Sequence, residues 1–182
     1  LTALQALRNK GQLKAGERVL INGASGGVGS YAVQIAKNMG ADVTGVCSTR
    51  NVERVLALGA DRVIDYKQSD YTEQGAQYDL IIDMDGNHSV LANSQVLAPG
   101  GRMVMVGGGA GDWIGPLVTP LTVLLLSPFL EHEFFNLLAQ FNEPDLELLA
   151  SMLAAGELQT MVDRHYPLAQ VREAIAYSET GR

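Results

Sequence analysis

Cysteine and histidine are scarce in this chain of 182 residues. The single cysteine, Cys47, cannot form an internal disulfide bond, and this suits a reducing compartment such as the cytoplasm. We interpret Cys47 as a small buried residue and not as a reactive thiol. The three histidines lie far apart, and none has a cysteine or carboxylate at metal-ligand spacing. We therefore expect no zinc site in this chain.

Positive charge and long apolar runs are also in short supply. The 13 lysines and arginines are outnumbered by 20 aspartates and glutamates, which disfavours a surface for nucleic acid or anionic membranes. The uncharged run at residues 113–130 falls short of the ~20 residues that a spanning helix needs. Pro116, Pro120 and Pro128 interrupt it as well. We predict no membrane-spanning segment and no nucleic-acid partner.

Strand and helix patterns alternate along the first 108 residues. The apolar spacing predicts strands over residues 18–22, 42–48, 62–66, 78–85 and 102–107, with helices over 28–39, 51–58 and 89–98. Such alternation with short connections is typical of a doubly wound α/β fold of the Rossmann type, a parallel sheet with helices on both faces. Two more helices are predicted over residues 144–155 and 168–177. Residues 131–141 fit a strand or a helix equally well.

The loop after the first predicted strand is the most informative segment. Residues 22–29 read Asn-Gly-Ala-Ser-Gly-Gly-Val-Gly, a variant of the dinucleotide-binding fingerprint with Ala24 in the first glycine position. In that pattern Gly26 permits close approach of a pyrophosphate and Gly29 permits close packing of helix on strand. The alternative is a tight turn that binds nothing. The position of the loop between a strand and a helix favours dinucleotide binding.

The end of the second predicted strand indicates which dinucleotide is bound. NAD sites usually place a carboxylate there for the ribose 2′-hydroxyl, but this chain has Ser48, Thr49 and Arg50. Two hydroxyls and a cation suit a 2′-phosphate, so we predict NADP(H). The alternative for Arg50 is a solvated residue at the start of the next helix.

Two other enzyme classes use similar glycine loops. Short-chain dehydrogenases need a Tyr-x-x-x-Lys pair, and no tyrosine here has lysine four positions later. Methyltransferases normally want a carboxylate after the second strand, which this chain lacks. We therefore exclude the first class and disfavour the second.

The order of several phrases along the chain points to one family. They are LTA (1–3), AGERVLINGASGGVG (15–29), CSTRN (47–51), LGADRVIDY (58–66), YDLIIDMDG (78–86), APGGRMVMVGGG (98–109) and VDRHYPLAQVREAIAYSETGR (162–182). This pattern resembles the medium-chain dehydrogenase/reductase superfamily, also called the zinc-containing alcohol dehydrogenase superfamily, in its quinone oxidoreductase-like branch. The resemblance implies that residues 1–182 are one six-stranded NAD(P)-binding Rossmann domain. An N-terminal catalytic domain and a final strand, which the family normally has, are expected to be missing from this chain.

The resemblance also implies roles for individual positions. The residues it assigns to the pyrophosphate are Ser25, Gly26, Gly27 and Val28. Those it assigns to the 2′-phosphate are Ser48 and Arg50, with Tyr66 after the third strand. Those it assigns near the nicotinamide ribose are Asp85, Gly86, Asn87, Val106, Gly107 and Gly108. Asn51 departs from the lysine of many quinone reductases. A sixth strand is expected near residues 132–138, at a sheet edge that pairs two copies into a homodimer.

The function that we predict is the NADPH-binding part of an oxidoreductase. Hydride would pass between NADP(H) and a quinone, enone, aldehyde or alcohol that lies between this domain and the catalytic one. Because the cofactor carries the chemistry, we assign no catalytic residue within this chain, and we expect the chain alone to be inactive. The alternative is a dinucleotide-binding module without turnover, either a redox sensor or an assembly subunit.

Overall fold

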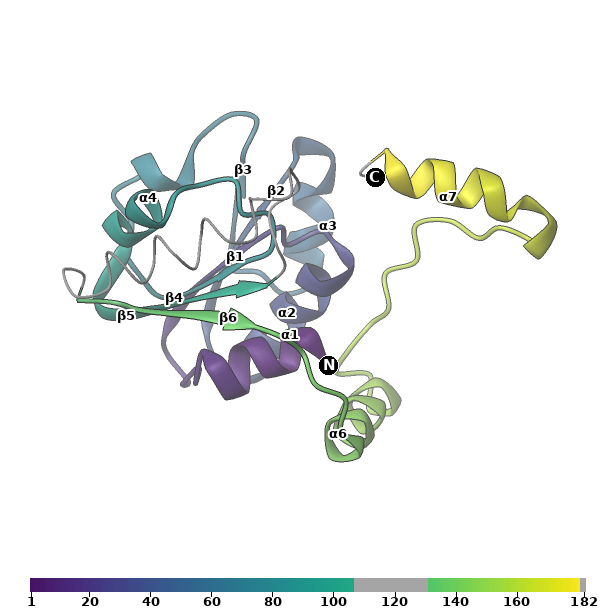
Figure 1. Ribbon diagram of the computed structural model, residues 1–182, viewed down its shortest axis with the longest axis horizontal. Coiled ribbons are helices and arrows are strands. Elements are labelled where there is room, and N and C mark those ends of the chain that lie inside the picture. Colours follow the sequence, from purple (N-terminus) through teal and green to yellow (C-terminus); the bar gives the residue numbers. More distant parts are fainter. Residues whose placement is uncertain (107–130, 181–182) are drawn as a thin grey trace.

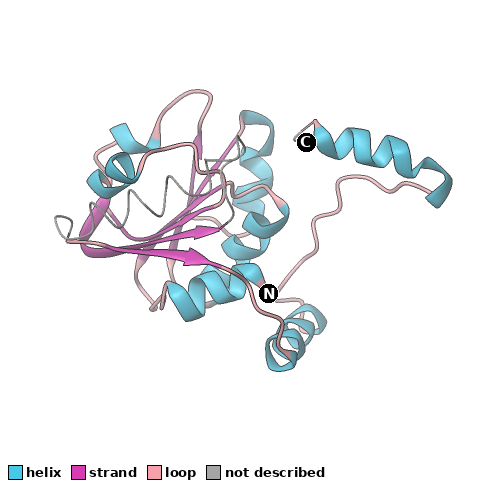
Figure 2. Ribbon diagram, viewed as in Figure 1, coloured by secondary structure: helices cyan, strands magenta, loops and turns pink. Residues whose placement is uncertain are grey.

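The computed structural model describes residues 1–106 and 131–180, and its centre is a sheet of parallel strands. The strands are β1 (Arg18–Asn22), β2 (Asp42–Cys47), β3 (Arg62–Asp65), β4 (Tyr78–Asp83), β5 (Leu97–Val106) and β6 (Glu133–Leu137). They lie in the order β3-β2-β1-β4-β5-β6, and every neighbouring pair is parallel (Figures 1 and 2). This is the Rossmann arrangement, so the predicted fold is confirmed.

Helices connect the strands and cover the sheet. They are α1 (Thr2–Leu4), η1 (Gln5–Lys10), α2 (Gly27–Asn38), η2 (Thr49–Asn51), α3 (Val52–Ala57), η3 (Tyr71–Glu73), α4 (Val90–Gln95), α6 (Glu143–Ala154), η5 (Leu168–Gln170) and α7 (Val171–Glu179). None of the helices in the described ranges is long and apolar enough to cross a bilayer.

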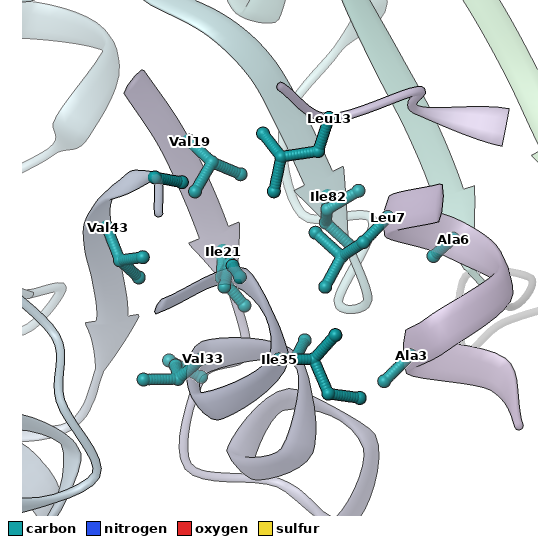
Figure 3. Packing of buried hydrophobic residues seen from close by; sticks show 14 of the residues in the cluster. Ala3, Ala6, Leu7, Leu13, Val19, Ile21, Val33, Ile35, Val43 and Ile82 are labelled. Atoms are coloured by element: carbon teal, nitrogen blue, oxygen red, sulfur yellow. The ribbon is translucent and has the colours of Figure 1, made fainter. Parts of the chain in front are cut away.

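Alternate side chains of the strands form two cores, one on each face of the sheet. Val19 and Ile21 of β1 point to one face, where they meet Val33 and Ile35 of α2 and Leu7 of η1 (Figure 3). The opposite face buries a second cluster, in which Leu20 of β1 packs with Tyr71, Val96 and other apolar residues. Strands that are buried on both faces can carry few polar side chains, and this explains the continuous apolar runs of the sequence.

The start of β5 was predicted too late along the chain. Residues 97 and 98 were expected to end a helix, but α4 stops at Gln95 and β5 begins at Leu97. Leu97 pairs with Tyr78, whose N–H donates to the Val96 carbonyl at 2.8 Å, and this pairing takes the chain out of the helix. The ambiguous segment 131–141 contains β6, which pairs with β5 and is the edge strand expected from the family resemblance.

The C-terminal part contacts the sheet domain at several places, among them the start of α6 and residues 157–160, which bond to α2. Asp145, at the start of α6, forms hydrogen bonds with Gln5 and Arg8 of η1. After α6 an extended stretch leads to α7, which stands off the body of the sheet beyond α3 (Figure 1). Most residues from 159 to 180 are exposed.

Candidate functional site

The turn between β1 and α2 depends on its glycines. Gly23 has a φ of +85°, which favours glycine, and the N–H of Ala24 donates to the Val46 carbonyl of β2 at 2.9 Å. A Cβ on Gly29 would overlap the carbonyl oxygen of Gly23 and lie 2.8 Å from its carbonyl carbon. The first turn of α2 can therefore pack on the end of β1 only with glycine at position 29.

The N-terminus of α2 is open to a ligand. Gly26 is the N-cap and offers no side chain to the first backbone N–H groups of the helix. A Cβ placed on Gly27 would meet nothing within 4 Å. Free N–H groups and the positive end of the helix dipole favour an anion at such a terminus. The turn thus fits the pyrophosphate of a dinucleotide.

A cavity of about 610 Å³ lies beside this turn. It is lined by Ser25, Gly26, Gly27, Ser30, Arg50, Asn51, Arg54, Met161, Asp163 and Tyr177. The Asn51 side chain forms part of the cavity wall, and its amide donates to Ser25 Oγ at 3.0 Å and to Ser48 Oγ at 3.3 Å. This side chain fixes the glycine turn relative to the end of β2.

Positive charge is available in the cavity. Arg50 is exposed and forms no ion pair with any residue in the described ranges, while Arg54 Nη1 lies 3.8 Å from Asp163 Oδ1. The pKa of Asp163 lies below its usual range, chiefly because the Tyr177 hydroxyl donates to its carboxylate at 2.6 Å. The lining therefore holds two guanidinium groups and one carboxylate.

The end of β3 lies next to this cavity and carries a second carboxylate. A hydrogen bond from the Thr49 hydroxyl is the main reason why the pKa of Asp65 is lowered. Burial raises the pKa of the neighbouring Cys47 thiol to about 11, with a further contribution from the charge of Asp65. Cys47 is therefore a buried, protonated thiol at neutral pH.

A second polar cluster lies on the other side of β1, where the strand order reverses. The Asn22 amide donates to Asp83 Oδ1 and to Asn87 Oδ1, both at 2.8 Å. Asp83 is 3% exposed, and it also accepts from the backbone N–H groups of Asp85 and Gly86. The pKa of Asp85 is raised by desolvation and by the charge of Asp83. This is the switch point at which open α/β sheets bind ligands.

The structure brings together some of the predicted residues and separates others. One cavity is lined by Ser25, Gly26, Gly27 and Arg50. Ser48 is not a lining residue, but its Oγ accepts a hydrogen bond from Asn51, which is one. The Val28 side chain lines a different, apolar groove between the N-terminus, α2 and α6.

The remaining predicted residues lie outside the cavity. Tyr66 is 51% exposed beside Lys67 and is not among the lining residues. Val106 is buried at the end of β5, and Gly107 and Gly108 lie outside the described residues.

Known proteins with this arrangement identify the family. A family model described as zinc-binding dehydrogenase matches residues 58–182. The chain belongs to the medium-chain dehydrogenase/reductase superfamily, in its quinone oxidoreductase-like branch. The structure of the quinone oxidoreductase from Coxiella burnetii has a TM-score of 0.84 at 31% identity, covering 100% of this chain and 54% of that one.

Two curated relatives match this chain over about half of their own length. The chloroplast envelope quinone oxidoreductase homolog of Arabidopsis thaliana is 32% identical over 190 residues, which cover 100% of this chain and 56% of that protein. Trans-enoyl reductase pgmF of Aspergillus terreus is 34% identical over 202 residues, covering 100% and 54%. The chain spans about half the length of the curated relatives it matches.

The family description mentions zinc, and the described residues do not fit it. In residues 1–106 and 131–180, no three side chains of histidine, cysteine, aspartate or glutamate gather closely enough to hold a metal ion.

Sequence reasoning missed part of the cavity. Arg54 could have been found, because it follows Arg50 by four positions and so lies on the same side of a helix. Met161, Asp163 and Tyr177 come from the C-terminal segment and have no local pattern that links them to the glycine turn. Their place depends on how the end of the chain folds back.

Proposed function

We propose that this chain binds NADP(H) and is the dinucleotide-binding part of an NADPH-dependent oxidoreductase. One observation supports it above the others: the open N-terminus of α2 shares a cavity with Arg50 and Arg54. A helix terminus that suits a pyrophosphate, next to cations that suit a further phosphate, matches the anionic half of NADP(H).

The residues after β2 favour NADP(H) over NAD(H). Ser48, Thr49 and Arg50 offer no carboxylate to a ribose 2′-hydroxyl at the usual position. The Asp65 carboxylate, at the end of β3, already accepts hydrogen bonds from the Lys67 backbone N–H and the Gln68 amide. Arg50 remains available for charge-assisted hydrogen bonds to a 2′-phosphate.

When bound, the dinucleotide would supply a hydride from its nicotinamide ring. The role of this chain is then to orient that ring at the switch point beside β4. There the Asn22–Asp83–Asn87 network holds the backbone of Asp85 and Gly86 in place. The names of the relatives, a quinone oxidoreductase homolog and a trans-enoyl reductase, support a quinone or enone as the hydride acceptor; aldehydes and alcohols are the other candidates.

The first test is a calorimetric titration with NADPH and NADH of the wild type, Gly27→Asp, Gly27→Asn and Arg50→Ala. We expect the wild type to prefer NADPH by at least about tenfold, because hydrogen bonds to charged groups contribute ~1.5–3 kcal/mol. Asp at position 27 suits the start of a helix but repels phosphates, so Gly27→Asp should weaken both cofactors by about tenfold or more while the fold persists. Gly27→Asn, of equal size and no charge, should lose far less.

The outcomes of that titration separate the alternatives. Arg50→Ala should remove most of the NADPH preference and leave NADH unchanged. Equal loss in Gly27→Asp and Gly27→Asn would argue against a phosphate at the α2 terminus. Binding without oxidation of NADPH by a quinone or enone, in a protein that contains a catalytic domain, would favour a dinucleotide module without turnover.

Two further features are part of the proposal. The edge position of β6, with half-buried Phe134 and Phe135, supports a homodimer formed through residues near 132–138. A monomeric mass in sedimentation at micromolar concentration would contradict it.

A cytoplasmic location is supported by the single buried thiol of Cys47, and cell fractionation tests it.

A further inference from the structure

The C-terminal segment closes one side of the cavity beside the glycine turn. Met161, Asp163 and Tyr177 line it, opposite Arg54 of α3. Arg54 Nη1 lies 3.8 Å from Asp163 Oδ1, so an aspartate carboxylate faces this guanidinium. A negatively charged group of the protein thus lies where an anionic ligand would find a cation.

Other contacts hold Asp163 in this position. The Tyr177 hydroxyl donates to Asp163 Oδ2 at 2.6 Å, and the Arg164 guanidinium lies 4.0 Å from the centre of the Tyr177 ring. The positive charges of Arg164, Arg54 and Arg50 all act on the Asp163 carboxylate. The carboxylate is therefore set among three guanidinium groups, of which those of Arg50 and Arg54 line the cavity.

The Arg54–Asp163 pair is well suited to be exchanged. The two side chains are 39% and 48% exposed, and exposed pairs of this kind contribute little to stability. A phosphate monoester carries up to two negative charges and three acceptor oxygens, so it competes well with one carboxylate for a guanidinium. Arg50 and Arg54, one helical turn apart, can both reach the same anion.

We propose that Arg54 binds the 2′-phosphate of NADP(H) together with Arg50, and that Asp163 is the counter-charge which this phosphate displaces. The inference rests on the proposed NADP(H) function and adds two specificity-determining residues to it. Arg54 raises the affinity for the phosphorylated cofactor. Asp163 lowers it, because its pair with Arg54 has to be broken and its charge repels the phosphate.

The chain contains a matched control pair. Arg62 and Asp42 are 56% and 38% exposed, and they form an ion pair at 2.7 Å at the opposite, amino ends of β3 and β2. Substitutions there change the same residue types far from the cavity. Any effect of net charge alone would appear in both pairs.

The test is calorimetric titration of the full chain with NADPH and with NADH. The variants are Arg54→Ala, Arg54→Lys, Asp163→Asn and the controls Arg62→Ala and Asp42→Asn. We expect Arg54→Ala to weaken NADPH by about tenfold, which is ~1.4 kcal/mol, and Arg54→Lys to retain part of that affinity. Asp163→Asn, which keeps an acceptor for Tyr177, should strengthen NADPH by about threefold. NADH and both controls should stay within about twofold of the wild type.

Each of the other outcomes contradicts one part of the proposal. If Arg54→Ala weakens NADPH and NADH equally, or neither, in a protein with an unchanged melting temperature, Arg54 does not bind the 2′-phosphate. If Asp163→Asn weakens NADPH, Asp163 is a ligand of the cofactor and not its competitor. Equal wild-type affinity for the two cofactors overturns this inference and leaves dinucleotide binding intact, whereas no binding of either overturns the proposed function as well.

Discussion

Two arginine–aspartate pairs join the C-terminal part of the chain to the sheet domain, and they differ in depth and in number of partners. Arg8 and Asp145 lie 2.6 Å apart, and Asp145 is 3% exposed. Gln5 and Asn142 also donate to the Asp145 carboxylate, at 2.9 and 2.8 Å. Arg54 and Asp163 lie 3.8 Å apart, and the Asp163 side chain is 48% exposed.

The deep pair fixes the structure of the chain, whereas the exposed pair leaves its charges available to other partners. A buried carboxylate with three side-chain donors cannot change partners without a large loss of free energy, so α6 is held firmly against η1. An exposed carboxylate in a long contact can change partners at little cost. The second pair is the one that lines the candidate cofactor cavity.

Removing the buried carboxylate should strongly reduce folding stability. Asp145→Ala leaves the donors of Gln5, Arg8 and Asn142 without their acceptor, and we expect a loss of about 2–4 kcal/mol in the free energy of unfolding. Asp163→Ala, the matched change in the exposed pair, should cost less than about 1 kcal/mol. Urea unfolding of both variants measures the two losses. Equal losses would mean that the two ion pairs contribute alike to stability.

The two ion pairs should also differ in how their contribution to stability depends on pH, and this difference should be smaller than the one between the alanine variants. Hydrogen bonds from Asn142, Gln5 and Arg8 lower the pKa of Asp145 to about 2, below the ~3.9 of an unfolded aspartate. A lowered pKa in the folded state means that Asp145 stabilises the protein fully above about pH 4, and that this stabilisation is lost as the pH falls toward 2.

Denaturant midpoints measured from about pH 6 down to about pH 2.5 test this dependence. Asp145→Asn should flatten the curve in the acid range, whereas Asp163→Asn should flatten it far less, because the Asp163 carboxylate is exposed. A flattened curve in Asp163→Asn alone would reverse the assignment.

The smallest expected effect concerns the contact that positions Asp163. Tyr177→Phe removes the hydroxyl whose hydrogen bond is the main cause of the lowered Asp163 pKa. We expect that pKa to rise toward its ordinary value and the free energy of unfolding to change by less than about 1 kcal/mol. A titration of the Asp163 carboxyl followed by NMR measures the change in pKa. An unchanged pKa would show that the surrounding arginines alone hold the carboxylate in its charged form.

Local features of this fold could be predicted from the sequence, and long-range ones could not. The glycine turn and the strands β1, β2 and β4 follow from short apolar runs and from the small residues between them. The start of β5 was placed wrongly, because the pairing of Leu97 with Tyr78 on β4 decides it. In the cavity, Arg50 was found from its position after β2, but Asp163 was not, because only the folded chain brings it to Arg54.

The strand order has a consequence for how the domain assembles. Strands β1 to β3 and strands β4 to β6 are each built from neighbours along the chain, and in the described sheet the pairing of β1 with β4 joins the two halves. Asn22 and Asp83, 61 positions apart, face each other across that seam. Because distant segments pay the larger loop-closure entropy, we expect the seam to form late in folding. A dinucleotide bound from the glycine turn to the end of β4 would contact both halves. Its binding would therefore stabilise the β1–β4 pairing, which forms late in folding.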